Sequence, residues 1–136
     1  MALRIGMDLV DVRDVEESLA RFGSRYLERV FTPAEIAASR GGSNASCLAV
    51  CFAAKEATLK ALPARGDGLG WTNIEVEIGP YQRTSLTLHG AAAEAAERAG
   101  ITALDVSVTR VGTYAAAIVL TEGSADRHPA SESCPC

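Results

Sequence analysis

The segment from Ser46 to Leu62 constrains the fold more than any other feature, because it is the longest stretch with helical periodicity in the chain. Its apolar stripe consists of Leu48, Cys51, Phe52, Leu59 and Leu62. Pro63 follows directly and predicts the end of the helix, since proline cannot continue one. The chain has no run of about 18 apolar residues, so we expect no transmembrane helix. The long helix should therefore bury its stripe within a globular domain.

Segments in which apolar residues alternate lie on both sides of this helix and predict β-strands. They cover residues 3–10, 72–78, 85–89, 104–110 and 114–121. Shorter helical segments are expected over residues 12–21, 26–30, 33–40 and 90–99. The order strand, helices, strand, strand, helix, strand, strand predicts one α+β domain. Its largely antiparallel sheet should pack against the long helix and the shorter helices.

The clearest local signal is a helix start at Thr32-Pro33-Ala34-Glu35. Thr32 is a good N-cap residue, and Pro33 suits the first helical position. Glu35 stands three residues after the cap, where its side chain can complete a capping box. Gly23 similarly predicts the end of the first helix.

The chain has 136 residues, of which 48% are hydrophobic, enough to build one core. We assign residues 1–122 to this domain. Residues 123–136 show no apolar period and are predicted to be disordered. The net charge of −4 argues against non-specific binding to nucleic acid or membrane surfaces. No secretory signal is visible, so the cytoplasm is the expected location.

Four cysteines are present, at positions 47, 51, 134 and 136. Neither pair has histidines at zinc-site spacing, because His89 and His128 lie far away in the sequence. We therefore expect reduced thiols that pack as small hydrophobic side chains or lie in the tail. A redox role for the C-terminal Cys-Pro-Cys is the alternative.

Lysine is rare in this chain, so the positions of the lysines are informative. Only Lys55 and Lys60 are lysines, against eleven arginines. Glu56 and Lys60 lie four residues apart and share one helix face. One interpretation is a surface ion pair, which contributes little to stability. The apolar surroundings instead favour a charged pair that borders a cleft.

Asp8 is the second candidate for chemistry, because an aspartate inside an apolar strand is unfavourable. It should point away from its apolar neighbours. It could lie at a strand end and cap the next helix. Alternatively, it could join Glu56 to hold Mg²⁺, which binds one or two carboxylates together with phosphate oxygens.

The glycine-rich loop Gly66-Asp67-Gly68-Leu69-Gly70 follows a helix instead of preceding one. It is therefore neither a P-loop nor a dinucleotide-binding loop, which place phosphate at a helix N-terminus. Arg65 beside it could still meet a phosphate.

Several motifs together resemble the holo-(acyl carrier protein) synthases, and the resemblance covers about residues 4–121. The N-terminal motif is Gly6-Met7-Asp8-Leu9-Val10-Asp11-Val12, followed by Phe31-Thr32-Pro33-Ala34-Glu35. The central motif is Phe52-Ala53-Ala54-Lys55-Glu56-Ala57 with Lys60-Ala61. Trp71 with Ile74-Glu75-Val76, Val106-Ser107-Val108-Thr109 and Tyr114-Ala115-Ala116-Ala117 match in order and spacing.

The resemblance implies transfer of 4′-phosphopantetheine from coenzyme A to a serine of an acyl carrier protein. Carrier proteins of fatty acid or polyketide biosynthesis are the expected partners. It implies Mg²⁺ at Asp8 and Glu56, with Glu56 and Lys60 as catalytic residues. The serine proton would pass to Lys60 or to a metal-bound water. It also implies a homotrimer with active sites between subunits.

Arginines form a candidate docking stripe for the carrier protein, which is acidic in this family. Arg21, Arg25 and Arg29 are spaced by four, and Arg13 lies nearby. They would form one stripe if helical geometry continued past Gly23. The alternative is a solvated charged face. The resemblance favours docking at Arg13, Arg21 and Arg25, because electrostatic steering suits a transient partner.

Departures from the family pattern concern the coenzyme A site. Cys51 stands where the family has arginine, and Arg110 stands where it has histidine. Pro63-Ala64-Arg65 replaces an early glycine turn. The coenzyme A contacts implied here are Arg65, Gly66, Gly68, Thr109 and Arg110.

Arg65 and Arg110 could restore the missing positive charge. The alternative hypothesis is a diverged member that has lost the transferase reaction. It would dock a carrier protein as a binding module or act on a carrier-bound substrate.

Overall fold

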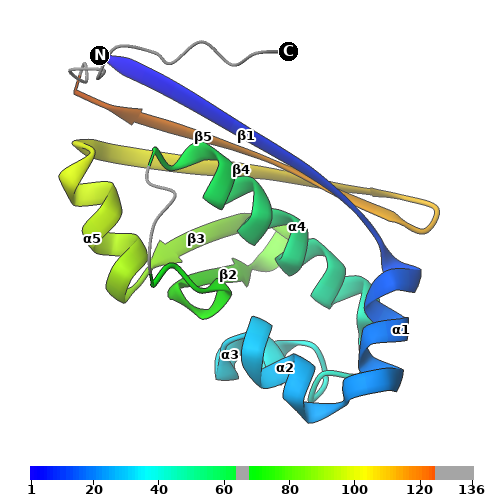
Figure 1. Cartoon of the computed structure of the whole chain (residues 1–136). Helices are drawn as coiled ribbons and strands as arrows, with labels where there is room; N and C mark the ends of the chain where they lie inside the picture. The colour runs from blue at the N-terminus through cyan, green and yellow to red at the C-terminus, as the bar shows by residue number, and fades with distance from the viewer. Residues whose placement is uncertain (64–67, 125–136) are drawn as a thin grey trace, which may run out of the picture.

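The structure, a computed structural model of the chain, describes residues 1–63 and 68–124 (Figure 1). The strands are β1 (Ala2–Asp11), β2 (Ile74–Ile78), β3 (Thr84–Leu88), β4 (Ile101–Val111) and β5 (Tyr114–Gly123). The α-helices are α1 (Val12–Phe22), α2 (Ser24–Val30), α3 (Pro33–Ala38), α4 (Ala45–Ala61) and α5 (Gly90–Arg98). Short 3₁₀ turns precede β2 (Trp71–Asn73) and β3 (Pro80–Gln82).

The strands form two antiparallel sheets. One has the order β1-β5-β4, with β5 in the centre, and the other is the β2-β3 hairpin. In the larger sheet Asp8 of β1 and Val108 of β4 both pair with Ala117 of β5. The α+β class and the antiparallel pairing predicted from the sequence are confirmed, with the strands divided between two sheets.

Helix α4 is the centre of the core, because it contacts β1, β5 and β4 of the larger sheet and also β2 of the hairpin (Figure 1). The stripe predicted for this helix is therefore too narrow. Phe52 and Leu59 are only partly buried, whereas residues on the other sides are buried. The buried set comprises Leu48, Ala49, Val50, Cys51, Ala53, Ala54, Lys55, Ala57, Thr58 and Ala61.

The contact between α4 and β1 depends on a glycine. A Cβ atom at Gly6 would lie 2.0 Å from the carbonyl oxygen of Ala57 and 2.9 Å from the backbone nitrogen of Ala61. Any other residue at this position would force the strand and the helix apart. Gly6 thereby places β1, and with it Asp8 two residues later, directly against α4.

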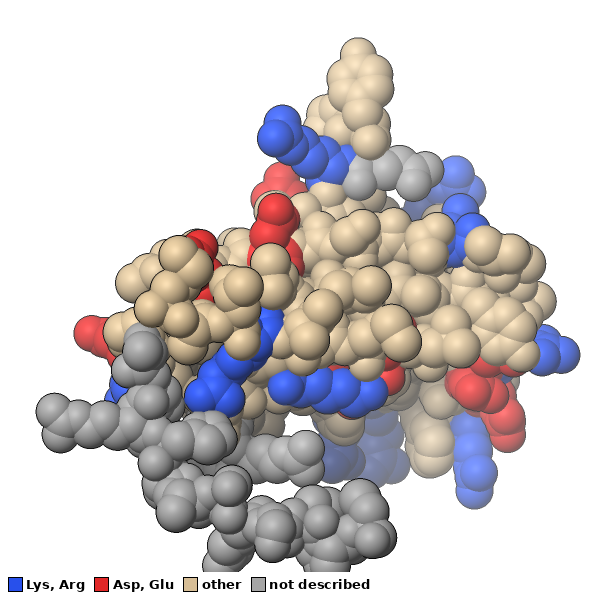
Figure 2. All heavy atoms as spheres, turned by 90° about the horizontal axis from the view of Figure 1, so that it is seen from above, with Lys and Arg blue, Asp and Glu red and all other residues tan. Residues whose placement is uncertain are grey.

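Strand β1 has the predicted alternation, but its larger apolar side chains lie on the exposed face and not on the face that meets the core. Gly6 and Val10 are buried against the helix layer, and Asp8 shares their face. The apolar side chains on the opposite face are 61–67% exposed, and they are Leu3, Ile5, Met7 and Leu9. Ile118 and Leu120 of β5 are each 43% exposed and pair with Met7 and Ile5. Figure 2 views the molecule from above this sheet and shows a largely uncharged face with charged groups around it.

Local boundaries follow turn chemistry. The capping box of Thr32 and Glu35 is confirmed, but α3 ends at Ala38, and Arg40 has a positive φ of 56°. Gly23 has φ 55° and separates α1 from α2, so the helix does not continue through it. Residues 71–73 form a 3₁₀ turn where the sequence predicted the start of a strand.

None of the helices in the described part of the chain has the length and apolar character that a membrane span requires. Strand β5 extends to Gly123. The rest of the predicted tail, from residue 125, lies outside the described residues.

Candidate active site

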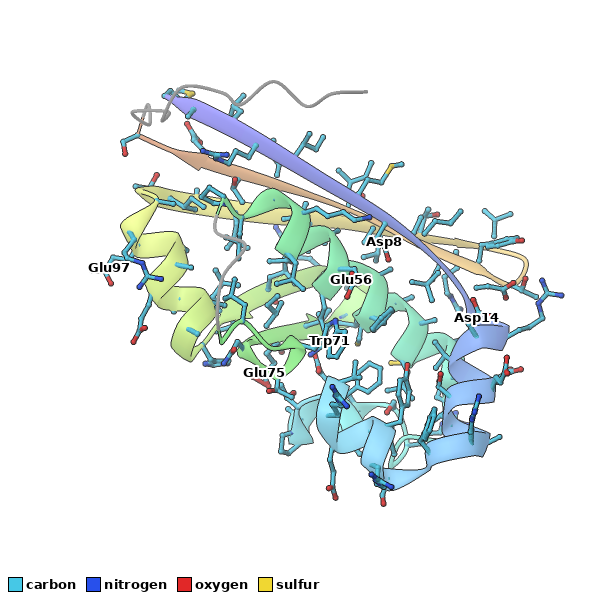
Figure 3. All side chains as sticks on the ribbon, viewed as in Figure 1. Asp8, Asp14, Glu56, Trp71, Glu75 and Glu97 are labelled. Atoms are coloured by element: carbon cyan, nitrogen blue, oxygen red, sulfur yellow. The ribbon has the colours of Figure 1, made fainter. Side chains whose placement is uncertain are left out.

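A hollow of about 360 Å³ opens between β1, the first two helices and α4. Its wall contains three carboxylates, from Asp8, Asp14 and Glu56, together with Leu9, Val10, Val15, Ser18, Tyr26 and Phe52. Figure 3 shows Asp8 on β1 and Glu56 on α4 in the same region, with Asp14 on α1 farther along. The structure thus brings together the two carboxylates that the sequence singled out.

Lys60 joins this site through Asp8. Its ammonium Nζ donates to Asp8 Oδ1 at 3.0 Å and to the backbone oxygen of Met7 at 3.0 Å. The Lys60 side chain is 51% exposed, whereas that of Asp8 is 17% exposed. Lys60 is therefore held by β1, half exposed, beside an aspartate of the hollow wall. Among the described residues no ion pair links it to Glu56, so the surface-pair interpretation is wrong.

Glu56 instead bonds to an indole. Trp71 Nε1 donates a short hydrogen bond to Glu56 Oε1. The Trp71 ring also packs against Phe52, with 6.1 Å between ring centroids. This partner was missed by the sequence analysis, in which Trp71 served only to match the family pattern. The available signal was a lone tryptophan directly after the glycine-rich loop.

A buried ion pair lies directly behind this contact. Lys55 Nζ is 2.6 Å from Glu35 Oε1, and both side chains are completely buried. Burial lowers the pKa of Lys55 from its ordinary value, and the charge of Glu35 opposes this effect. Glu35 also accepts from the backbone nitrogens of Thr32 at 2.8 Å and Val76 at 2.7 Å. The sequence predicted the capping role of Glu35 but not its pairing with Lys55.

The candidate docking arginines do not form one stripe. Arg13 donates to both carboxylate oxygens of Asp11, with an ion-pair distance of 2.7 Å. This pairing lowers the pKa of Asp11, chiefly through the side-chain hydrogen bond. The Arg21 guanidinium lies 5.3 Å from the centre of the Phe22 ring. Because Gly23 breaks the helix, Arg25 and Arg29 do not continue the helical face of Arg21.

Arg25 and Arg29 line a hollow of about 450 Å³. The remaining wall is largely apolar or aromatic and consists of Phe22, Tyr26, Val30 and Trp71. Tyr26 also lines the carboxylate hollow, so the two hollows are neighbours. The arginine hollow therefore offers positive charge and aromatic surface beside the candidate active site.

Thr109 and Arg110 lie in another place, in a hollow of about 210 Å³ at the beginning of α4. Cys47 is part of the same wall. Asp8 lines the carboxylate hollow and Arg110 lines this one, so the two residues belong to different hollows. Arg65 and Gly66 fall outside the described residues, and Gly68 has a positive φ of 93°.

The thiols of Cys47 and Cys51 influence each other. The hydrogen bond from Cys51 and the charge of Arg110 lower the pKa of Cys47 to about 7. The same hydrogen bond, followed by burial, raises the pKa of Cys51. Both are free cysteines, as predicted. Cys51 and Arg110, the two single-residue departures from the family pattern, thus meet around Cys47.

The similarity of this chain to known proteins agrees with the geometry of the site. The profile of the 4′-phosphopantetheinyl transferase superfamily matches residues 4–119. A holo-[acyl-carrier-protein] synthase from Desulforudis audaxviator is 39% identical, with 93% of this chain and 97% of that protein covered. One from Koribacter versatilis is 40% identical, with 90% and 99% covered.

Solved structures give the same result. A structure entitled "Chronobacterium ammoniagenes ACPS-CoA complex" superposes with a TM-score of 0.80 at 30% identity, covering 92% of this chain and 100% of that one. A Helicobacter pylori holo-[acyl-carrier-protein] synthase in complex with coenzyme A gives a TM-score of 0.75 at 30% identity, covering 87% and 99%. The chain therefore belongs to the holo-[acyl-carrier-protein] synthase family and is an enzyme of the 4′-phosphopantetheinyl transferase superfamily.

Proposed function

We propose that this enzyme transfers 4′-phosphopantetheine from coenzyme A to a serine of an apo acyl carrier protein, in a reaction that depends on Mg²⁺. The serine oxygen forms the new bond to phosphorus while the bond to the bridging diphosphate oxygen breaks. Adenosine 3′,5′-bisphosphate leaves with that electron pair. The observation that carries the proposal is the shared hollow of Asp8 and Glu56, with Lys60 bonded to Asp8.

The residues at the hollow fit a magnesium ion. Asp8 and Glu56 supply carboxylate oxygens, which Mg²⁺ prefers, and phosphate oxygens of the substrate would complete its shell. When bound, Mg²⁺ would stabilise negative charge that develops on the diphosphate. Among the described residues no cluster of three or more acidic, histidine or cysteine side chains is arranged to hold a metal alone. A site completed by substrate phosphate suits this enzyme class.

Lys60 is a cation beside the hollow that could act on the reacting groups. Its ammonium is anchored at Asp8 and exposed enough to contact a phosphate oxygen. In its neutral form the same nitrogen could accept the serine proton. Replacement by arginine separates the two roles, because arginine keeps the charge but cannot act as a base.

The nucleotide end of coenzyme A would bind at Thr109 and Arg110. Arginine holds phosphate through two parallel hydrogen bonds, which matches the charge of this substrate. Arg110 lines a different hollow from Asp8 and Glu56, which is consistent with a complete site built by two copies of the chain. We therefore propose a homotrimer with active sites between subunits.

The exposed apolar face of β1 and β5 supports self-association. Its members are Leu3, Ile5, Met7, Leu9, Ile118 and Leu120 (Figure 2). A contiguous apolar patch of this kind marks an interface, since water contact with it is unfavourable. Sedimentation of the purified chain would test the trimer.

The carrier protein would dock beside the carboxylate hollow, at Arg25 and the neighbouring aromatic groups. Arg21 and Arg13 would contribute charge around this surface. Arg13 would do so less, since Asp11 already pairs with it. The cytoplasm is the compartment that we propose, in keeping with the composition.

The deciding experiment incubates the enzyme with an apo acyl carrier protein, coenzyme A and MgCl₂, followed by intact mass measurement of the carrier. One phosphopantetheinyl increment is expected, and EDTA should prevent it. Glu97→Gln is the matched control for Glu56→Gln, because it removes the same charge on α5, away from the hollow (Figure 3). If no increment forms although the carrier protein binds, the chain is instead a docking module that has lost the reaction.

A further inference from the structure

We propose that Trp71 is a positioning residue for Glu56, holding one carboxylate oxygen so that the other remains available to a divalent cation. The inference rests on the proposed metal role of Asp8 and Glu56. It concerns a residue of the enzyme that would contact neither the transferred group nor the cation. Figure 3 shows Trp71 beside Glu56, on the side away from Asp8.

The first observation is the contact itself. Trp71 Nε1 donates to Glu56 Oε1. Within the described part of the chain, the Glu56 side chain makes no other hydrogen bond. An indole N–H is a donor only, so it fixes the carboxylate without competing for the cation. A partner of this kind orients a ligand for the metal, and such partners strongly affect metal affinity.

The second observation is that Trp71 is held at two points by consecutive residues of α4. Glu56 receives the indole hydrogen bond, while Lys55 Nζ donates to the backbone oxygen of Trp71 at 2.9 Å. Lys55 also donates to the backbone oxygen of Ile74 at 2.7 Å, at the start of β2. The indole and the carboxylate are thus tied to the same turn of one helix.

The third observation is that the anchor is buried. Lys55 and Glu35 form an ion pair at 2.6 Å, and both side chains have no exposed surface. A buried lysine keeps its place only while its partners remain, because an unpaired buried charge is very unfavourable. The Trp71 backbone is therefore rigidly located, and its ring has Phe52 against it. Glu56 gains a fixed donor instead of a mobile one.

Mn²⁺ binding provides a test that does not depend on activity. Free Mn²⁺ is measured by electron paramagnetic resonance during titration of the wild-type enzyme and of three variants in the presence of coenzyme A. Trp71→Phe keeps a ring but removes the donor, and it should weaken Mn²⁺ binding about tenfold, the lower end for loss of a ligand-orienting partner. Glu97→Gln on α5 is the control, because it removes a carboxylate away from the hollow, and its Mn²⁺ affinity should stay within about twofold of wild type. Asp8→Asn removes a proposed ligand and should abolish tight binding.

A second measurement needs no change at Trp71. The chain has one tryptophan, so its indole N–H gives a single resonance in a ¹⁵N-correlated spectrum. In Glu56→Gln this resonance should move upfield, because a neutral amide oxygen is a weaker acceptor than a carboxylate. Glu97→Gln should leave it in place.

The outcomes separate the two proposals. Wild-type Mn²⁺ affinity in Trp71→Phe, an equal loss in Glu97→Gln, or an unmoved indole resonance in Glu56→Gln would each overturn the positioning role. Absence of Mn²⁺ binding by the wild-type enzyme, or normal binding by Asp8→Asn, would instead overturn the metal site of the proposed function, and the positioning role with it.

Discussion

Replacing Gly6 by alanine should damage the active site without touching a charged residue. The added Cβ would lie 2.0 Å from the Ala57 carbonyl oxygen, whereas ordinary contacts begin at 3.4 Å. The strand and the helix must therefore separate by about 1.4 Å, the difference between these two values. The three atoms nearest the new methyl group all belong to the α4 backbone, so no side-chain rotation relieves the clash.

The energetic and catalytic effects follow from this displacement. Overpacking in a tight core lowers the free energy of unfolding by about 1–3 kcal/mol, and a clash with backbone atoms should cost at least the upper value. The 3.0 Å contact between Lys60 and Asp8 bridges the same two elements and should open. A misplacement of about 1 Å in a catalytic site can reduce the rate about a hundredfold. We expect a loss of about 3 kcal/mol in unfolding free energy and about a hundredfold loss of transfer rate.

Denaturant unfolding and the carrier-protein mass assay measure the two effects. Gly112→Ala is the matched control, because Gly112 has φ 60° and no neighbour within 4 Å of its Cβ position. That variant should lose only about 1 kcal/mol from backbone strain and keep its activity. A Gly6→Ala enzyme with wild-type stability and rate would refute the close approach of β1 and α4 as the device that places Asp8.

Further predictions concern single side chains. Glu56→Gln should reduce transfer at least a hundredfold while Glu97→Gln stays near wild type, and equal rates for both would contradict the role of Glu56. Arg110→Ala should raise the KM for coenzyme A by about one to two orders of magnitude. Dephospho-coenzyme A, which lacks the ribose 3′-phosphate, shows whether Arg110 binds that phosphate. If mutant and wild type discriminate equally between coenzyme A and dephospho-coenzyme A, Arg110 does not bind the 3′-phosphate. Alkylation of Cys47 should accelerate as pH rises through about 7, because the thiolate is the reactive form and its pKa is lowered to about 7. Cys51→Ala removes the main cause and should move this inflection toward the ordinary value of 9.0, and an unmoved inflection would disprove the thiol–thiol hydrogen bond. Arg25→Glu should raise the KM for the carrier protein far more than that for coenzyme A, most strongly at low salt, and an unchanged value there would mean that Arg25 is only a solvated charge.

Local signals in the sequence were sufficient for much of the fold. The cap at Thr32 and Glu35 is set by neighbours in the chain, and the structure has it where the sequence predicts it. The strands and helices also follow from period and from turn residues. The tertiary contacts of a single side chain could not be predicted in this way, because they depend on elements that are distant in sequence.

The two lysines show why the site was only partly predictable. Lys55 and Lys60 are five residues apart, so they point about 140° apart around a helix with 3.6 residues per turn. Both sides of α4 are rich in apolar residues, so the pattern does not say which lysine is buried. The structure buries Lys55 against Glu35 and leaves Lys60 half exposed at Asp8. The hairpin that covers the Lys55 side decides this, and it lies later in the chain.

The same reasoning applies to β1. Alternation identifies two faces but not the one that meets the core. Here the small and acidic residues face α4, because close approach requires Gly6 and the hollow requires Asp8. The larger apolar residues then occupy the outer face. A face of this composition is explained by a second copy of the chain, which the proposed trimer would supply.

One electrostatic effect explains why this chain differs from the family pattern at both Cys51 and Arg110. Cys51 is 2% exposed, and the charges of Glu35 and Lys55 both act on its thiol. An arginine at this position would bring a second cation to a region where one buried carboxylate already pairs with one buried lysine. Desolvation of an additional charge there is unfavourable unless it finds its own partner. Arg110 instead carries its guanidinium on β4, on an exposed residue of the hollow that Thr109 and Cys47 share. The phosphate-binding role proposed for Arg110 would thus place the positive charge on an exposed strand residue, while the helix keeps a neutral side chain beside its buried ion pair.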